Sequence, residues 1–235
     1  MRSSRVCCFV GFLRAAVLAV AWMVPASAAI TFDFSTGDGG FTSGGTPAWA
    51  YTTNWTLPGA NSANATLTSP TMTASGGAVT LQFSHSRNME GSFDGGVLEF
   101  SVGANPFLYI PNSQFTQNGY NGTSVDTGVN TALGTTGITP NSMFQGNLTN
   151  QISIAQLAAN LNAGDLFRFR FHYASDPSVI TSINTTWVIT SATVDGVPEA
   201  VPEPATLPLI LVGGIAIAAL GRRRFHKLPV PPAHR

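Results

Sequence analysis

The sequence predicts an all-β protein built as an antiparallel β-sandwich, flanked by an N-terminal signal helix and a C-terminal transmembrane helix. Two apolar segments near the ends of the 235-residue chain enclose a polar middle of about 170 residues. Within that middle, short runs alternate apolar and polar side chains, as half-buried strands do, and glycine-rich turns separate them. Many short strands with turn signals are typical of a sandwich of the jelly-roll type.

Residues 1–29 have the features of a secretory signal peptide. Arg2 and Arg5 precede an apolar run, and small residues end it at Ala26-Ser27-Ala28. This order predicts export and cleavage after Ala28 or Ala29. The alternative is an uncleaved membrane anchor.

Residues 201–227 form a second apolar signal with a different order of features. Pro202, Glu203 and Pro204 precede an apolar segment that we expect to be a transmembrane helix over residues 205–221. A basic cluster follows, made of Arg222, Arg223 and Arg224. Positive charges stay on the cytoplasmic side, so residues 228–235 are predicted to be a cytoplasmic tail and residues 30–200 an exterior domain.

The order Pro-Glu-Pro, apolar helix and arginine cluster resembles the PEP-CTERM sorting signal, over about 27 residues. The resemblance implies that an exosortase recognises Pro202, Glu203 and Pro204. It also implies an inner-membrane intermediate and onward sorting to the cell surface or extracellular matrix of a Gram-negative bacterium. The alternative is an ordinary single-pass anchor.

Alternation predicts four main strand regions in the exterior domain. The clearest is Leu166–Tyr173, where Phe167, Phe169, Phe171 and Tyr173 share one face and Arg168, Arg170 and His172 share the other. The other regions are Val79–Ser84, Val97–Val102 and a last pairing segment within Thr186–Val194. The stretch Asn112–Asn141, rich in Gly, Thr and Asn, is predicted to be a binding loop or a poorly ordered insertion.

The segment from His85 through Glu90 to Asp94-Gly95-Gly96-Val97-Leu98-Glu99-Phe100-Ser101 resembles the central hairpin of MAM-like jelly-roll domains. The opening Phe32-Asp33-Phe34 and the strand Phe167–Phe171 fit the same pattern. The resemblance implies a concanavalin-like sandwich with a binding or structural role.

Charge and cysteine content exclude several functions. Residues 30–200 hold three basic and ten acidic side chains, a net charge of −7, which is unsuited to nucleic-acid binding. Both cysteines, Cys7 and Cys8, fall within the signal peptide. The exterior domain therefore has no disulfide, thiolate metal site or cysteine nucleophile.

A calcium site is the candidate cofactor site. Ca²⁺ takes six to eight oxygen ligands, and Asp33, Glu90 and Asp94 stand at predicted strand ends and turns. Many members of the family place an Asp after the late Trp run, where this chain has Thr190. The alternative for Asp94-Gly95-Gly96 is a plain solvated turn.

Sugar binding is suggested by the aromatic residues Trp49, Tyr51 and Trp55, because exposed rings stack on sugar faces. The same residues are equally suited to the core.

Catalysis is not expected. His85 and His172 lie in strands without a nucleophile motif or metal-ligand spacing. Glu90 and Asp94 could imitate a glycosidase pair, but spacing along the sequence cannot establish the separation that this chemistry needs.

We therefore expect an exported, non-enzymatic structural or adhesive protein of the cell surface or matrix, associated with exopolysaccharide. The alternatives are a carbohydrate-binding module and a secreted hydrolase.

Overall fold

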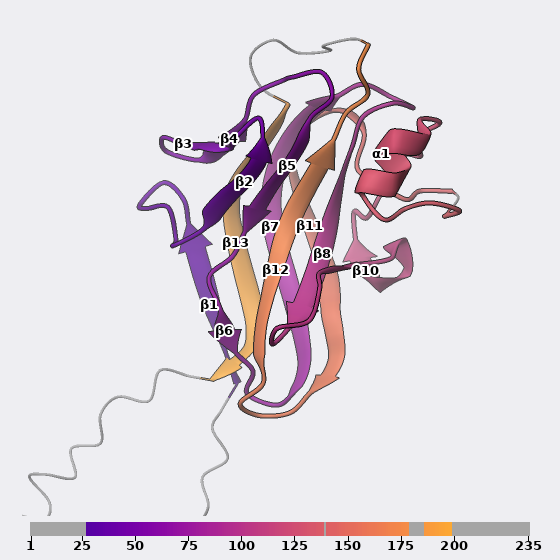
Figure 1. Cartoon of the computed structure of the whole chain (residues 1–235). Coiled ribbons are helices and arrows are strands. Elements are labelled where there is room, and N and C mark those ends of the chain that lie inside the picture. The colour runs from indigo at the N-terminus through magenta and orange to yellow at the C-terminus, as the bar shows by residue number, and fades with distance from the viewer. Residues whose placement is uncertain (1–26, 139, 179–185, 199–235) are drawn as a thin grey trace, which may run out of the picture.

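The computed structural model describes residues 27–138, 140–178 and 186–198, and these form two antiparallel β-sheets packed face to face (Figure 1). The predicted all-β sandwich is confirmed. Within these residues, the helical elements are the six-residue α1 (Thr127–Ala132) and the 3₁₀ turn η1 (Asn112–Gln114). In the same part of the chain, no helix has the length and apolar character that a membrane crossing requires.

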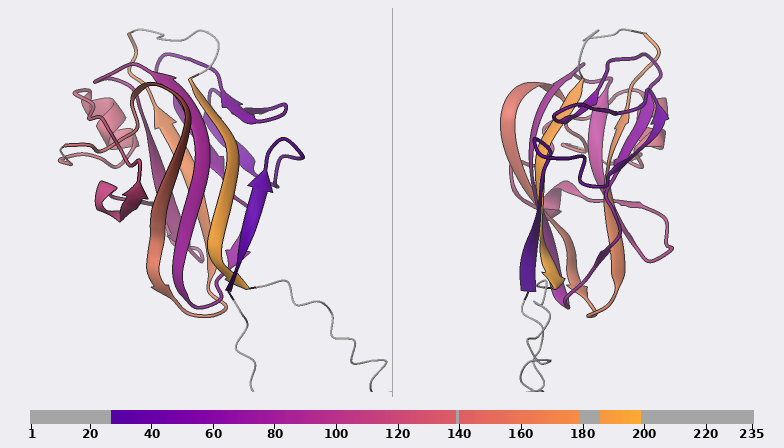
Figure 2. Two further views of the ribbon diagram at one scale, coloured as in Figure 1. Left: turned by 180° about the vertical axis from the view of Figure 1, so that it is seen from behind. Right: turned by 90° about the vertical axis from the view of Figure 1, so that its left-hand side faces the viewer.

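The first sheet, sheet A, has seven strands and is built around three long neighbours. In spatial order these are β11 (Gly146–Leu161), β7 (Gly77–Met89) and β13 (Trp187–Pro198). Figure 2 (left) shows them side by side. At the edges lie β10 (Phe115–Gln117), β4 (Trp55–Leu57), β3 (Ala50–Tyr51) and β1 (Ser27–Asp33).

The second sheet, sheet B, has six strands centred on β12 (Leu166–Ala174). On one side β12 pairs with β8 (Gly95–Val102), which in turn pairs with β9 (Leu108–Tyr109). On the other side it pairs with β6 (Met72–Thr73) and with β5 (Asn64–Thr68), which is followed by β2 (Thr42–Thr46). The predicted strand regions all coincide with long strands of the two sheets.

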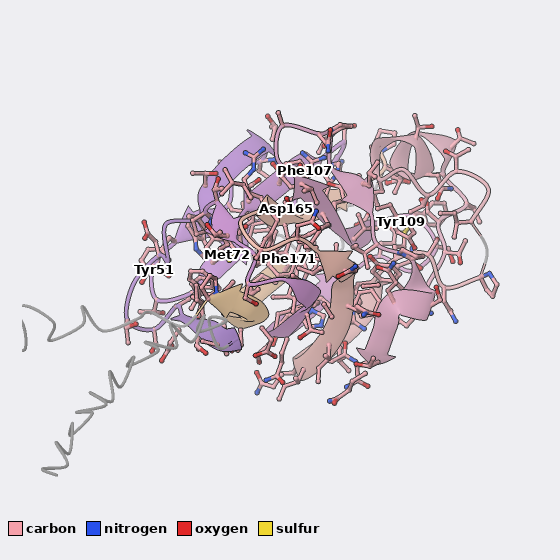
Figure 3. All side chains as sticks on the ribbon, turned by 90° about the horizontal axis from the view of Figure 1, so that it is seen from below. Tyr51, Met72, Phe107, Tyr109, Asp165 and Phe171 are labelled. Carbon is pink, nitrogen blue, oxygen red and sulfur yellow. The ribbon has the colours of Figure 1, made fainter. Side chains whose placement is uncertain are left out.

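The alternation in β12 buries one face as predicted. Phe167, Phe169, Phe171 and Tyr173 are each at most 1% exposed, and Phe171 contacts the rings of Phe83 and Trp187 from sheet A. In Figure 3, which looks along the sandwich from below, Phe171 lies near the middle and Tyr51 at the margin. Side chains of both sheets thus meet in one core, whose burial is the main source of stability for a domain without disulfides.

The opposite face of β12 carries a charged network. The Arg170 guanidinium is paired with Glu99 of β8, and His172 Nδ1 lies 3.2 Å from the other Glu99 oxygen. Asn64 Oδ1 lies 2.7 Å from His172 Nε2. Burial alone raises the pKa of Glu99, but hydrogen bonds from His172 and Arg170 outweigh this and hold it below its ordinary value.

The stretch 112–141 is structured where it is described. It contains η1, β10 and α1, which begins after Asp126, whose carboxylate accepts a hydrogen bond from Val129 N (2.8 Å). Buried Tyr120, Val129 and Leu133 join the main core. The segment therefore covers the side of the sandwich next to β8, which is buried on both faces.

The two ends of the domain lie side by side. Ser27 of β1 pairs with Pro198 of β13, and Figure 1 shows the start of β1 and the end of β13 at the same end of the sandwich. The first strand begins at Ser27, three residues before the boundary predicted at residue 30. The rest of the predicted signal peptide and the predicted transmembrane helix lie outside the described residues.

Candidate metal centre

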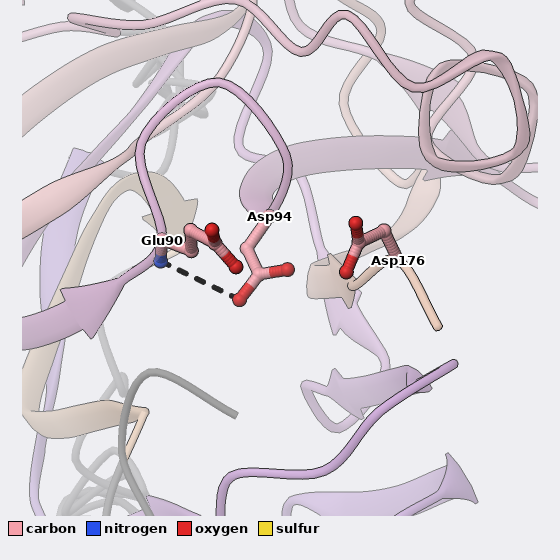
Figure 4. Close-up of side chains that lie close together, drawn as sticks. All are labelled: Glu90, Asp94 and Asp176. Carbon is pink, nitrogen blue, oxygen red and sulfur yellow. Dashed lines mark hydrogen bonds between the residues drawn. The ribbon is translucent and has the colours of Figure 1, made fainter. Parts of the chain in front are cut away.

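Three carboxylates converge at the end of the sandwich opposite its termini. Glu90 directly follows β7, Asp94 directly precedes β8, and Asp176 lies two residues after β12. One carboxylate oxygen from each lies within 4.8 Å of the other two. Figure 4 shows the three side chains close together. The centre therefore joins the connection between the two sheets to the end of a central strand of sheet B.

A tight turn fixes the first two carboxylates relative to each other. Asp94 N donates to Glu90 O (3.2 Å), and Glu90 N points at Asp94 Oδ2 (3.4 Å). Ser92 has a left-handed backbone (φ 70°), which lets the chain reverse within four residues. Gln145 supports the turn from the side, because its Nε2 donates to Asp94 O (2.7 Å) and its Oε1 accepts from Ser92 N (3.3 Å).

The two glycines after Asp94 are required by packing. A Cβ on Gly95 would lie 2.1 Å from Met143 Sδ, and one on Gly96 would lie 2.5 Å from the Trp187 ring. Asp94 itself is only 3% exposed. The segment Asp94-Gly95-Gly96 is thus a closely packed strand start, so the alternative of a plain solvated turn does not hold.

The polar contacts of the centre leave two carboxylate oxygens without a donor. Asp94 Oδ2 accepts from Tyr173 Oη (3.0 Å), but the buried Asp94 Oδ1 and Glu90 Oε2 have no hydrogen-bond partner. Asp176 accepts from Ser178 N (3.1 Å) and Ser178 Oγ (2.6 Å). Buried polar atoms nearly always find a partner, so an orphan oxygen beside two further carboxylates indicates a place for a cation.

Burial also changes the ionisation of the centre. Loss of solvent raises the pKa of Asp94 to about 6, and the neighbouring Glu90 charge adds to the effect against hydrogen bonds that oppose it. Burial and the adjacent Asp94 likewise raise the pKa of Tyr173 well above its ordinary value, so its hydroxyl stays protonated and donates. Three carboxylates this close repel one another unless a proton or a cation lies between them.

The donor set fits a hard cation. All three side chains offer oxygen, and none of the three offers nitrogen or sulfur, which favours Ca²⁺ or Mg²⁺ over zinc. Carboxylates on two separate connections accommodate the variable geometry of Ca²⁺ better than the strict octahedron of Mg²⁺. Asp94, Glu90 and Asp176 are the residues that would hold such an ion.

The predicted calcium set was partly wrong. Glu90 and Asp94 come together, but Asp33 does not join them. Asp33 ends β1, and its Oδ1 accepts from Ser35 N (3.0 Å) and Ser35 Oγ (2.7 Å). These hydrogen bonds lower the pKa of the exposed Asp33 carboxyl and account for its position without a metal. The third carboxylate is Asp176, which the sequence prediction missed.

The predicted aromatic sugar platform is largely part of the core. Trp49 and Trp55 are 4% and 6% exposed, and the Trp49 ring packs near Trp187. Tyr51 is half-buried, and its hydroxyl donates to Phe34 O (2.9 Å). Burial leaves neither tryptophan an open ring face for stacking on a sugar, so this expectation is wrong for Trp49 and Trp55.

The two domain histidines have structural partners. His85 Nδ1 accepts from Trp187 Nε1 (3.1 Å), so Nε2 carries the proton and donates to Ser153 Oγ (3.1 Å). Burial lowers the pKa of His85 to about 3, with help from the Arg87 charge. A neutral, fully bonded imidazole of this kind holds β7, β11 and β13 together.

Comparisons with known proteins find few similar proteins. No protein-family model matches the chain, and no curated protein sequence matches it. Among solved structures, one similar chain is a point mutant of the Emp46p carbohydrate recognition domain, with 9% identity over 69% of this chain and 91% of that chain and a TM-score of 0.39. The metal-free form of the same domain has 10% identity over 66% and 87%, with a TM-score of 0.37. Likeness at this level says nothing about which ligand this chain binds.

The predicted sorting residues Pro202, Glu203 and Pro204 and the cluster Arg222, Arg223 and Arg224 lie outside the described residues. The sorting motif therefore stays a prediction from sequence.

Proposed function

We propose that this chain is an exported, non-enzymatic protein of the cell surface or extracellular matrix, whose β-sandwich carries a calcium centre at the end remote from its membrane tether. Residues 1–29 direct export, and an exosortase acts on the tail at Pro202, Glu203 and Pro204. The helix over residues 205–221 holds the intermediate in the membrane. The exterior domain has a structural or adhesive role in contact with exopolysaccharide.

The observation that carries this proposal is the placement of the termini relative to the acidic centre. Ile30 of β1 pairs with Val194 of β13 toward one end, whereas Arg87 pairs with Trp187 toward the other. The 13 residues of β7 span roughly 40 Å between those ends at ~3.3 Å per residue. A domain tethered through residue 198 would hold its termini toward the membrane and present Glu90, Asp94 and Asp176 outward.

The cation would act as a clamp. When bound, Ca²⁺ would supply positive charge that neutralises the three carboxylates, and Asp94 Oδ1 and Glu90 Oε2 are the oxygens available to hold it. Glu90 and Asp94 lie on the connection between the sheets, and Asp176 lies after the end of β12, so a shared cation would link these two segments. Tyr173 donates to Asp94 and orients it, as partners of ligating carboxylates do. The centre would thus stiffen the exposed end of a domain that has no disulfide.

Burial of the centre supports a non-enzymatic role over a secreted hydrolase. Glycosidase carboxylates flank a bond in an open cleft, about 5 to 9.5 Å apart. Asp94 is 3% exposed and shares its site with two more carboxylates.

Localisation and processing of the full chain test the proposal. In a host with an exosortase, we expect a mature form that lacks residues 1–29 and is recovered from the envelope or matrix. Replacing Pro202, Glu203 and Pro204 by alanine should leave the protein in the inner membrane with its tail intact, as shown by mass spectrometry of the C-terminus. A chain found in the cytosol with its first 29 residues intact would overturn the proposal.

Calcium binding is tested separately by calorimetric titration of the purified full chain. We expect binding that is lost in Asp94→Asn and weakened in Asp176→Asn. An absence of binding up to 10 mM, on the order of ten times the weakest extracellular sites, would remove the cation from the proposal and leave the sorting result untouched.

A further inference from the structure

A polar recess of about 180 Å³ lies on sheet A and is separate from the metal centre. It spans β11, β7 and β13, the strands shown side by side in Figure 2 (left). Its polar uncharged lining consists of Ser86, Asn88, Asn147, Thr149 and Thr186. Leu148 and Val188 supply apolar surface.

The recess results from an irregularity in strand pairing. The β11–β7 register shifts between Leu148 and Gln151, where Asn150 has a left-handed backbone (φ 53°). Asn150 N donates to Ser86 Oγ (2.9 Å), which ties the displaced chain back to β7. Irregularities of this kind redirect side chains and are enriched beside binding sites.

Two amides face each other across this part of the sheet. Asn88 and Asn147 are directly opposite partners in the register, with Asn88 half-buried and Asn147 exposed. Neither side-chain amide, nor the Thr149 hydroxyl, has a hydrogen-bond partner among the described residues. Each amide offers two donors and one acceptor carbonyl, so the pair presents both kinds of group to a ligand.

The hydrogen-bonding groups of the recess and the net charge of the domain favour a neutral ligand. Arg87 is the one charged residue of the lining, and its guanidinium donates to Gln145 O (2.9 Å) and Asn121 Oδ1 (3.3 Å) and lies over Phe144. Its N–H donors are thus used by neutral groups of the domain. The rest of the domain is acidic, which disfavours uronic acids and other anions.

From this arrangement we propose that the recess binds a neutral saccharide, with Asn88 and Asn147 recognising hydroxyl groups of one sugar ring. Sugar hydroxyls both donate and accept, as the two amides do, and Val188 and Leu148 offer contact to the ring's C–H groups. The volume is below the 300 Å³ or so typical of sites for larger ligands, which limits the recess to about one ring. The site deepens the proposed association with exopolysaccharide and rests on the exterior location of the domain.

Binding of soluble oligosaccharides to the purified full chain in a non-glycosidic detergent tests this site. A panel of neutral hexose and N-acetylhexosamine oligosaccharides is compared with uronic acid oligosaccharides. We expect a neutral oligosaccharide to bind, with Kd raised about tenfold by Asn147→Ala and again by Asn88→Ala, the effect of losing hydrogen bonds to the ligand. The matched control Asn160→Ala, exposed on the same strand β11, should bind as the unmodified chain does.

Three results would overturn the proposal: preference for uronic acids, binding unchanged in both variants, or no neutral oligosaccharide bound at 10 mM. Circular dichroism melting of each variant separates loss of binding from loss of fold. Because the assay uses purified protein, a negative binding result does not change the localisation result that tests the proposed function. Correct localisation likewise does not count as support for sugar binding.

Discussion

Replacing Asp94 by asparagine should stabilise the cation-free domain at neutral pH and abolish its response to calcium. Asparagine has the shape of the protonated acid and can still accept from Tyr173 Oη, which lies 3.0 Å from Asp94 Oδ2. It removes the buried negative charge that loss of solvent and the neighbouring Glu90 disfavour. The substitution therefore reproduces the neutral state of the centre at every pH.

The magnitude follows from the pKa of the buried carboxyl. Its pKa is about 6 in the folded chain against an ordinary value of 3.8. Because the folded state holds the proton more tightly, stability falls as pH rises from about 4 to beyond about 6. At about 1.36 kcal/mol per pKa unit, the free energy of unfolding at pH 7 is lower by about 3 kcal/mol. For a domain of this size, that is about 6–12 °C in Tm.

Calcium binding should restore the free energy of unfolding that is lost when Asp94 ionises. A ligand at one hundred times its Kd adds about 2.7 kcal/mol to the folded state. The full chain would therefore melt several degrees higher in calcium at pH 7, whereas Asp94→Asn would melt at one temperature with and without it. At pH 4.5 the calcium effect and most of the difference between the two proteins should disappear.

The assay is thermal melting followed by circular dichroism, at pH 4.5 and 7.0, in metal-depleted buffer with and without added calcium. Asp195→Asn is the matched control, because Asp195 is an exposed carboxylate of β13 near the other end of sheet A. The reasoning fails if calcium does not change the Tm of the unmodified chain at pH 7 and the Tm of Asp94→Asn is no higher than that of the unmodified chain in metal-free buffer.

Three further substitutions test the packing that positions the site. Phe171→Ala should lower the free energy of unfolding by about 3–5 kcal/mol in denaturant titrations, because the ring is fully buried between the sheets; a loss below about 1 kcal/mol would contradict its core position. Gly96→Ala should cost about 1–3 kcal/mol by overpacking, since its Cβ would meet the Trp187 ring, and an unchanged midpoint would show that the ring can move. Glu99→Gln should cost about 2 kcal/mol at pH 7. The pKa of Glu99 is lowered in the folded chain, so its contribution is present above about pH 4.5 and is lost as pH falls; a pH-independent cost would exclude the ionised form.

The strands could be predicted from the sequence because their signal is local. In Leu166–Tyr173 the side chains alternate with a period of two, and that alternation alone assigns Phe167, Phe169 and Phe171 to the core. The sequence also placed Glu90 and Asp94 at predicted strand ends and turns. The predicted export and sorting signals are also linear features, and they remain predictions from the order of residues in each terminal segment.

The third carboxylate depended on tertiary structure. Asp176 follows a strand of sheet B and lies 82 positions from Asp94, and nothing in the spacing of the two residues links them. Antiparallel pairing of β12 with β8, with Ala174 opposite Gly95, brings the end of one strand to the start of the other. Asp33 has the same residue type and a similar position at a strand end, but the pairing of β1 with β13 takes it elsewhere.

Burial of the aromatic residues was decided in the same way. Trp49, Tyr51 and Trp55 have ring systems that suit both a sugar platform and a core, and their local sequence does not distinguish the two. Packing of the Trp49 ring near Trp187, more than a hundred positions away, places it inside. A local pattern determines which face of a strand is apolar, whereas strand pairing determines what lies against that face and which distant charges meet.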